Sequence, residues 1–285
     1  ERRFRVVRHL LRRERWDFAM VVEMGVDRMH HGFWSQMAAD HPKHVPGNPY
    51  QNAIRDYYRY IDREVGELLD LLDDDVLVML VSDHGARTMA GGICFNDWLI
   101  REGYLVLKSQ PQGIVPIEKV EVDWARTTAW GAGGYYGRLF LNVQGREPQG
   151  LVPPERYEAV RAEISAKLAA LLAPQGRPLG TVVYRPEQVY REVRNIAPDL
   201  IVYFGNLAWR SVGSIGYDSL YTMENDTGPD DANHAQHGLF ALYDPRHPAG
   251  VRRDGLHIQD VAPTILDRLG VALPEGMGGR VIRAQ

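Results

Sequence analysis

The chain has 285 residues, 45% of them hydrophobic and 25% charged, a composition typical of a globular protein and unlike that of collagen-like, disordered or low-complexity chains. Its 33 basic and 37 acidic residues give a net charge of −4, so it has no basic excess with which to bind a nucleic-acid backbone. A single cysteine excludes an internal disulfide framework, and no apolar run approaches the roughly 20 residues that span a bilayer. We therefore expect a cytoplasmic protein that has neither nucleic acid nor a membrane as a partner.

The first 15 residues form an arginine-rich stretch with the sequence ERRFRVVRHLLRRER. Such a stretch can serve as an arm for a membrane surface or a nucleic acid, but it is more often a solvated helix. We favour the surface helix and expect Val6, Leu10 and Leu11 to pack inward. Because the sequence starts without Met and soon reaches an apolar run, we also expect that an amino-terminal segment is missing.

Strand-length apolar runs alternate with helical patterns along the chain. The runs cover residues 18–24, 76–81, 200–204 and 239–243. Between the first two, residues 50–72 place apolar side chains three to four positions apart, the spacing of an amphipathic helix. Continuous apolar strands joined by long helices are typical of a buried parallel sheet. The sequence therefore predicts an α/β fold with a mostly parallel sheet covered by helices on both faces.

The middle of the chain departs from this pattern. Short β-like pieces at 104–107 and 138–143 lie among Gly and Pro residues, and residues 153–172 follow with helical spacing. We interpret this part as a small α+β insertion, after which core strands resume near Thr181 and a last helix follows at 260–269. The predicted organisation is a first core part, an insertion or cap, and a second core part, with the bounds 1–102, 103–180 and 181–285.

Candidate metal ligands follow the first apolar run. In an open α/β sheet, ligands bind at the carboxyl ends of the strands. Residues 18–24 are followed by Asp27 and His31, which share a face at i and i+4 if a helix begins there and can then bind one cation. On its own, such a pair is more often a chance pairing on the surface.

A second pair of candidate ligands follows residues 76–81, in the sequence Ser82-Asp83-His84-Gly85. Adjacent side chains of a regular strand point to opposite faces, so Asp83 and His84 can bind one metal only where the backbone turns. Gly85 permits such a turn. The alternative is an Asx-type turn with a surface histidine.

A third candidate is a histidine ahead of residues 239–243, either His234 or His237, although a histidine in a loop is more often solvated. Together, acidic and imidazole side chains at predicted strand ends, without thiolates, suit Zn²⁺ or Mn²⁺ in a hydrolytic site. Two such ions roughly 4 Å apart can bind the attacking and leaving oxygens of a displacement at phosphorus.

Seven runs of the sequence carry a family resemblance, and they occur in one order between about residues 16 and 282. They are WDFAMVVEMGVDRMHHGFW, LVMLVSDHGA, FNDWLIREGYLVLK, LFLNVQGREPQGLV, APDLIVYF, HAQHGLFALYDP and DVAPTILDRLGVALPEGMGGRVI. The chain resembles the alkaline phosphatase superfamily, and most closely its phosphohydrolase/phosphomutase branch, near the type I phosphodiesterases and nucleotide pyrophosphatases. The SDHG element is a fairly specific part of this resemblance.

The resemblance implies a first metal site. In the family, the Asp and His of a D-xxx-H motif bind one ion together with a later His, which here would be Asp27, His31 and His234. The family's later His stands four residues before a Gly that opens a strand. His234 has that spacing to Gly238, so His237 is the less favoured ligand.

The resemblance also implies a second metal site, in which Asp83 and His84 of the SDHG element would bind the other ion. His30 is out of register with the D-xxx-H motif, and we interpret it as a neighbour and not a ligand. The cofactors implied are two divalent metal ions, for which zinc is favoured and manganese is the alternative.

The family further requires a Thr or Ser nucleophile and another Asp for the second metal, both from an early segment. Nothing before Asp27 fits, because Asp17 precedes the apolar run and no Ser or Thr occurs before Ser35. We therefore expect the nucleophile upstream of residue 1. By this interpretation the chain is the carboxy-terminal portion of such an enzyme, and its own turnover is weak or absent.

The activity implied by the resemblance is hydrolysis of a phosphate monoester or diester, in a small phosphorylated substrate, by a two-metal mechanism through a phospho-enzyme. One alternative is a phosphomutase of the same superfamily, which would move phosphate between hydroxyls of one substrate. Another is a non-catalytic metal-binding domain. The sequence leaves open whether the protein is a homo-oligomer.

Several other residues have two possible roles. Asn96, Arg87, Arg126 and Arg138 can orient a substrate phosphate, but Asn96 can equally cap a helix and the arginines can lie on the surface. The tryptophans can line a pocket, although most such aromatics pack in the core. We expect Cys94 to be a small buried hydrophobic residue.

Overall fold

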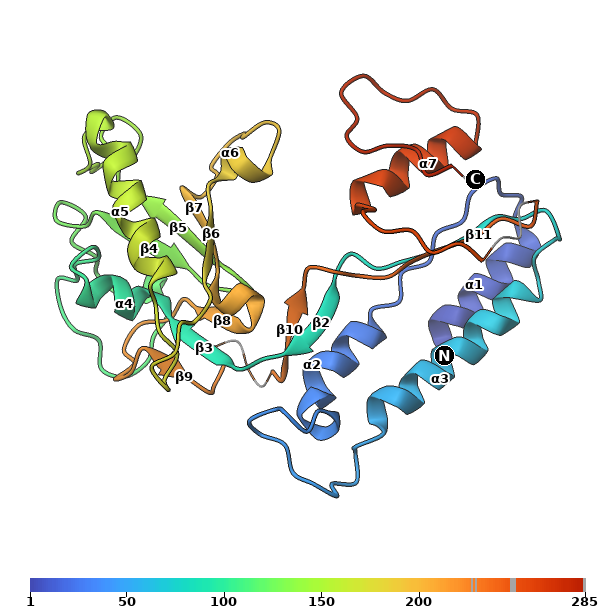
Figure 1. The fold of residues 1–285 in the computed structure, drawn as a ribbon, viewed down its shortest axis with the longest axis horizontal. Helices are drawn as coiled ribbons and strands as arrows, with labels where there is room; N and C mark the ends of the chain where they lie inside the picture. The colour runs from blue at the N-terminus through green and yellow to red at the C-terminus, as the bar shows by residue number, and fades with distance from the viewer. Residues whose placement is uncertain (227, 229, 247–249, 284–285) are drawn as a thin grey trace. The chain divides into compact units, whose positions relative to one another are not determined.

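The computed structural model describes residues 1–226, 228, 230–246 and 250–283, and the chain divides into two compact units (Figure 1). Unit 1 comprises Glu1–Val26, Ile54–Gly85 and Gln236–Gln285, and unit 2 comprises Asp27–Ala53 and Ala86–Ala235. The α-helices are α1 (Arg2–Arg13), α2 (Gly25–Met37), α3 (Ala53–Leu69), α4 (Phe95–Arg101), α5 (Tyr157–Ala169), α6 (Pro186–Val189) and α7 (Val261–Arg268). None of these helices has both the length and the apolar character that crossing a membrane requires.

The strands form several small sheets instead of one large one. They are β1 (Val78–Val81), β2 (Gly85–Thr88), β3 (Gly91–Cys94), β4 (Ala129–Ala132), β5 (Gly137–Leu141), β6 (Val182–Tyr184), β7 (Leu200–Tyr203), β8 (Trp209–Val212), β9 (Tyr221–Thr222), β10 (Ala232–Ala235) and β11 (Phe240–Tyr243). Short 3₁₀ turns lie at Ile117–Lys119, Pro154–Arg156, Phe204–Leu207 and Ile258–Asp260. The sheets have the strand orders β1-β11, β10-β2, β8-β3-β9 and β4-β5-β7-β6.

In unit 1, the arginine-rich helix α1 packs against α3 (Figure 1). Phe4 is only 3% exposed, and the Arg8 guanidinium donates to a Glu64 carboxylate oxygen at 2.7 Å. Val6 and Leu10, which we expected to pack inward, are 56% and 48% exposed. For these two residues the prediction was wrong, because the face of α1 turned toward α3 is the one that carries Phe4 and Arg8, whereas Leu11 is half-buried.

Two of the predicted apolar strands meet in unit 1 as a two-stranded ribbon. Strand β1 pairs with β11 from Val78 opposite Tyr243 to Val81 opposite Phe240, and the pairing is antiparallel. Among the described residues no further strand pairs with β1 or β11, and Val81 remains 42% exposed. The sequence therefore predicted both strands correctly, but not their direction or their burial.

The predicted strand at residues 18–24 does not form in the structure. Met20 is 74% exposed and Val22 is 56% exposed, and the carbonyl of Val22 accepts a hydrogen bond from the Arg3 side chain at 2.6 Å. A strand needs a neighbouring strand to satisfy its backbone groups. No strand of the described residues pairs with this run, which accounts for its irregular backbone.

Unit 2 contains the four-stranded sheet β4-β5-β7-β6, in which every neighbouring pair is antiparallel. Helix α5 packs against this sheet (Figure 1). Among the strand pairs whose direction is described, only β3 and β8 run parallel. The α/β class is therefore correct, but a mostly parallel sheet covered on both faces is not what these residues form. Alternation of apolar runs with helices does not specify strand direction, because antiparallel strands can also be fully buried.

The hydrophobic core lies in unit 2. Its fully buried residues include Ile93, Phe95, Leu99, Leu105, Leu139, Leu141, Ile164, Leu168, Leu200, Val202, Phe204 and Ile215. The side chains of Trp98, Trp124, Trp130 and Trp209 pack in or against this cluster, so these tryptophans contribute to the core. Cys94 is fully buried, as expected, and burial raises the pKa of its thiol to about 12.

Candidate metal centre

Helix α2 presents two possible metal ligands on one face. It begins at Gly25 directly after the apolar run, so Asp27 lies in its first turn and His31 one turn later. The Asp27 Oδ1 atom lies 3.3 Å from His31 Nε2. Asp27 is 45% exposed and His31 is 18% exposed, so the pair is open to solvent on the carboxylate side.

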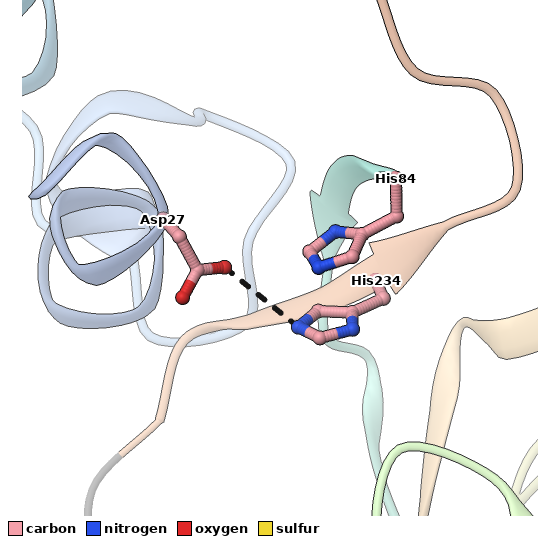
Figure 2. Close-up of side chains that lie close together, drawn as sticks. All are labelled: Asp27, His84 and His234. Carbon is pink, nitrogen blue, oxygen red and sulfur yellow. Dashed lines mark ion pairs between the residues drawn. The ribbon is translucent and has the colours of Figure 1, made fainter. Parts of the chain in front are cut away.

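Strand β10 brings His234 to the same pair. Its Nε2 atom lies 3.3 Å from His31 Nε2 and 3.7 Å from Asp27 Oδ1 (Figure 2). The contact between α2 and the start of β10 is fixed nearby, where the Asp231 amide donates to the His31 carbonyl at 2.9 Å. Ser35 also donates its hydroxyl to the Asp231 carboxylate at 2.5 Å. Three potential ligand atoms thus converge within unit 2, although His234 is 203 residues from His31 in the sequence.

The spacing of these three atoms is suitable for a small divalent cation. Zinc bound at about 2.0–2.1 Å in tetrahedral geometry separates neighbouring ligand atoms by about 3.3–3.4 Å, and the observed sides of the triangle are 3.3, 3.3 and 3.7 Å. Imidazole nitrogen and carboxylate oxygen are also the ligand atoms that zinc accepts. The residues therefore fit such an ion, and the exposed side of Asp27 leaves room for a further ligand.

The second ring nitrogen of His31 is held by a carboxylate. His31 Nδ1 lies 2.7 Å from Asp230 Oδ1, and the other Asp230 oxygen is paired with the Arg210 guanidinium. An ionised carboxylate only accepts hydrogen bonds, so Nδ1 carries the proton and Nε2 of the neutral ring presents its lone pair. The pKa of His31 is raised, mainly by its hydrogen bond to Asp230, and burial opposes this rise.

Tyr135 packs on the other histidine. Its ring lies nearly parallel to that of His234, with a centroid separation of 3.6 Å and an interplanar angle of 21°. The Arg210 guanidinium lies over the same tyrosine ring at 4.5 Å from the centroid. Arg210 therefore contacts both the carboxylate behind His31 and the aromatic ring beside His234.

Asp83 and His84 lie in unit 1, directly before β2. Asp83 Oδ2 is 3.3 Å from His84 Nε2, and His84 Nδ1 lies 2.9 Å from the Gly85 carbonyl oxygen, to which it donates. In the neutral ring this again leaves Nε2 as the atom that can bind a metal. Asp83 is 79% exposed and His84 is 26% exposed. The side chain of His84 is also drawn in Figure 2.

Gly238, whose spacing from His234 favours that histidine over His237 as a ligand, has a structural role of its own. A Cβ atom at this position would lie 2.4 Å from Ser82 Oγ, and Ser82 Oγ accepts the hydrogen bond of the Leu239 amide at 2.6 Å. Only glycine allows this close approach of backbone and side chain. His237, one residue earlier, is exposed.

The lower-ranked candidate residues have mainly structural contacts. Asn96 is fully buried, and its side-chain amide donates to the carbonyls of Gly131 and Gly213 while its oxygen accepts from the Gly131 amide. These bonds give Asn96 a structural role, but not the expected one of a helix cap, because the N-cap of α4 is Cys94. The Arg87 guanidinium donates to the Asn206 carbonyl at 2.7 Å. His30 contacts the ring of the neighbouring Trp34 edge-on.

Three residues around the centre were missed by sequence reasoning, namely Asp230, Arg210 and Tyr135. Asp230 had a usable signal, because it stands four residues before His234 in an acidic pair. No sequence signal marks Arg210 or Tyr135, because a single Arg in a strand and a Tyr in a glycine-rich turn are compatible with many roles. Their positions become informative only once β8 and the turn before β5 are placed.

A comparison with protein families finds that residues 1–230 match the family described as type I phosphodiesterase / nucleotide pyrophosphatase. The matched part includes Asp27, His31, Asp83 and His84 and ends just before His234. A comparison with curated proteins returned no significant match.

Proposed function

The chain belongs to the type I phosphodiesterase/nucleotide pyrophosphatase family, part of the alkaline phosphatase superfamily, and we propose that it serves metal-dependent hydrolysis of a small phosphate ester. The family points to a phosphoric ester hydrolase and generally uses divalent metals. The observation that carries the proposal for this chain is the triangle of Asp27, His31 and His234, whose ligand atoms lie 3.3 to 3.7 Å apart.

Asp27, His31 and His234 are the residues that we propose for the first metal. A divalent ion bound there would supply a Lewis acid that polarises a phosphoryl oxygen and stabilises the charge that develops on it. Asp27 contributes a negative charge on the solvent-facing side, and each histidine contributes a neutral Nε2. Zinc is the ion we propose, because the distances between the ligand atoms are close to those expected around tetrahedral zinc. Manganese is the alternative.

Asp83 and His84 are proposed for a second metal, as the family resemblance implies. Their adjacent ligand atoms, 3.3 Å apart, are spaced as two ligands of one ion are. We assign no nucleophile in this chain, because the family's Thr or Ser comes from an early segment and no Ser or Thr precedes Ser35.

The proposal is tested first by metal content. Elemental analysis of the purified chain should find zinc or manganese, and Asp27→Ala and His84→Ala should each lower the occupancy. His237→Ala is the matched control, because it removes an exposed histidine three residues from His234 and should leave the metal content unchanged. Unchanged metal content in both ligand variants would reject these ligand assignments.

The reaction is tested on the protein with p-nitrophenyl phosphate and bis-p-nitrophenyl phosphate. Release of nitrophenol from one ester in preference to the other would decide between monoester and diester hydrolysis, and Asp27→Ala should abolish it. Metal binding without hydrolysis of either ester would favour a non-catalytic metal-binding domain. Phosphate transfer to a second hydroxyl without release of free phosphate would favour a mutase.

A further inference from the structure

The buried carboxylate of Asp230 is engaged on both of its oxygens. Oδ1 lies 2.7 Å from His31 Nδ1 and also accepts from the Ala232 amide at 3.3 Å, while Oδ2 is paired with Arg210. The Asp230 side chain is only 9% exposed. Burying a charge costs free energy unless it is paired and hydrogen-bonded. Asp230 meets this condition through His31, Ala232 and Arg210, so both of its oxygens are occupied by protein contacts.

Arg210 is held in place by the fold of unit 2. It lies in β8, which pairs with β3 with Arg210 opposite Gly92, and its side chain is only 8% exposed. From there it reaches the Asp230 carboxylate and the face of the Tyr135 ring. An arginine is suited to both contacts at once, because its planar guanidinium can pair with a carboxylate and lie over an aromatic ring.

Tyr135 is fixed by its backbone as well as by its ring. The residue before it, Gly134, exchanges two backbone hydrogen bonds with Ser211, of 2.8 and 3.0 Å. The Tyr135 carbonyl accepts from the Asn233 side chain at 3.2 Å, next to His234. With the ring stacked on His234 at 3.6 Å, rotation of that imidazole about its side-chain bonds is restricted.

Resting on the metal site proposed above, we propose that Arg210, Asp230 and Tyr135 are positioning residues that hold the imidazoles of His31 and His234 with both Nε2 atoms directed at Asp27. Asp230 fixes the tautomer and the plane of His31, Tyr135 fixes the plane of His234, and Arg210 links the two by contacting Asp230 and Tyr135. Residues behind metal-binding histidines commonly change metal affinity by about 10- to 100-fold when they are removed. None of the three residues is proposed as a metal ligand or as a contact of the substrate.

The test is Co²⁺ binding to the full chain, followed by visible absorption, which reports the ligands around the ion, and by titration, which gives the affinity. Asp230→Ala should weaken Co²⁺ binding by about 10- to 100-fold and change the spectrum. Asp230→Asn keeps an oxygen that can accept from His31 Nδ1 and should restore part of that loss. Asp218→Asn is the control, because Asp218 is an exposed carboxylate of unit 2 that is not among the residues around the two histidines; its affinity should match the wild type.

Tyr135→Leu should also weaken binding, because it removes the stacked ring while keeping an apolar side chain. Circular dichroism of each metal-free variant separates a loss of positioning from a loss of folding. If Asp230→Ala does not fold, Asp230→Asn and Tyr135→Leu decide the question. Wild-type affinity and an unchanged spectrum in both of these would overturn the inference. A wild-type chain that binds no Co²⁺ would instead reject the metal site itself, which is a separate outcome.

Discussion

Two apolar runs of similar character have opposite environments in the two units. In unit 2, β7 places Leu200 and Val202 at 0% exposure between two neighbouring strands. In unit 1, residues 18–24 leave Met20 and Val22 more than half exposed. Both runs have strand-length apolar sequence, so the difference lies in whether neighbouring strands are present. An apolar run predicts the capacity to form a buried strand, but burial depends on partners elsewhere in the chain.

The largest expected effect is a truncation inside the well-packed region. Leu200→Ala should reduce the free energy of unfolding by about 2–5 kcal/mol, because it removes a fully buried side chain and leaves a cavity. Val22→Ala in the exposed run should change it by no more than about 0.5 kcal/mol. Urea denaturation of both variants, followed by tryptophan fluorescence and circular dichroism, checks the contrast. Similar losses in the two variants would mean that residues 18–24 are packed as well as β7.

A smaller destabilisation is expected at the close backbone contact behind Tyr135. A Cβ atom at Gly133 would lie 2.5 Å from the Gly213 nitrogen and 2.8 Å from the Ser211 oxygen. Backbone atoms cannot move aside cheaply, so Gly133→Ala should cost about 1–3 kcal/mol of unfolding free energy. It should also weaken Co²⁺ binding, since the same turn holds Tyr135. A stable variant with normal Co²⁺ affinity would contradict both expectations.

A gain in the free energy of unfolding is expected when a glycine of unit 1 is replaced by alanine. Gly66 lies inside α3, and a Cβ atom there would meet nothing within 4 Å. Alanine in a helix interior is more stable than glycine by roughly 0.5–1 kcal/mol, so Gly66→Ala should raise the free energy of unfolding by about that amount. The measurement is thermal unfolding followed by helical circular dichroism. A lower midpoint would show that α3 has a neighbour at this position.

The most subtle expected effect concerns the pH dependence of unit 1. Burial raises the pKa of Asp260, but the backbone amides of His257 and Arg280, which donate to its carboxylate at 2.9 Å each, outweigh burial, so its pKa lies below the usual value. A lowered folded-state pKa stabilises the fold above the unfolded pKa of about 3.9 and loses that contribution as the pH falls through the folded value.

Asp260→Asn should therefore be less stable than the wild type near neutral pH, and the difference should shrink below about pH 4. Denaturant unfolding at several pH values measures it. Gln259→Ala, a change to an exposed neighbouring side chain that does not titrate, serves as the control, and any stability difference it causes should not vary with pH. A stability difference for Asp260→Asn that is constant down to pH 3 would contradict the assignment of the shift to this carboxyl group.

Local elements were the best predicted features of the fold. The helix expected at 50–72 is α3, the one at 260–269 is α7, and the run 76–81 contains β1. Each depends on side chains within a few positions of one another, which the sequence displays directly. Strand direction and the choice of neighbours were not predictable in this way, because antiparallel β5 and β7 come from segments about 60 residues apart.

Of the candidate site, the sequence alone determined the residue types and their local spacing, because the i, i+4 geometry of a helix places Asp27 and His31 together wherever α2 packs. The tertiary structure decided that His234 joins this pair and that Asp230, Arg210 and Tyr135 stand behind the two histidines. One of those contacts, between His31 and His234, joins residues 203 positions apart. Such contacts form only when separate strands and helices pack, and no local pattern in the chain records that packing.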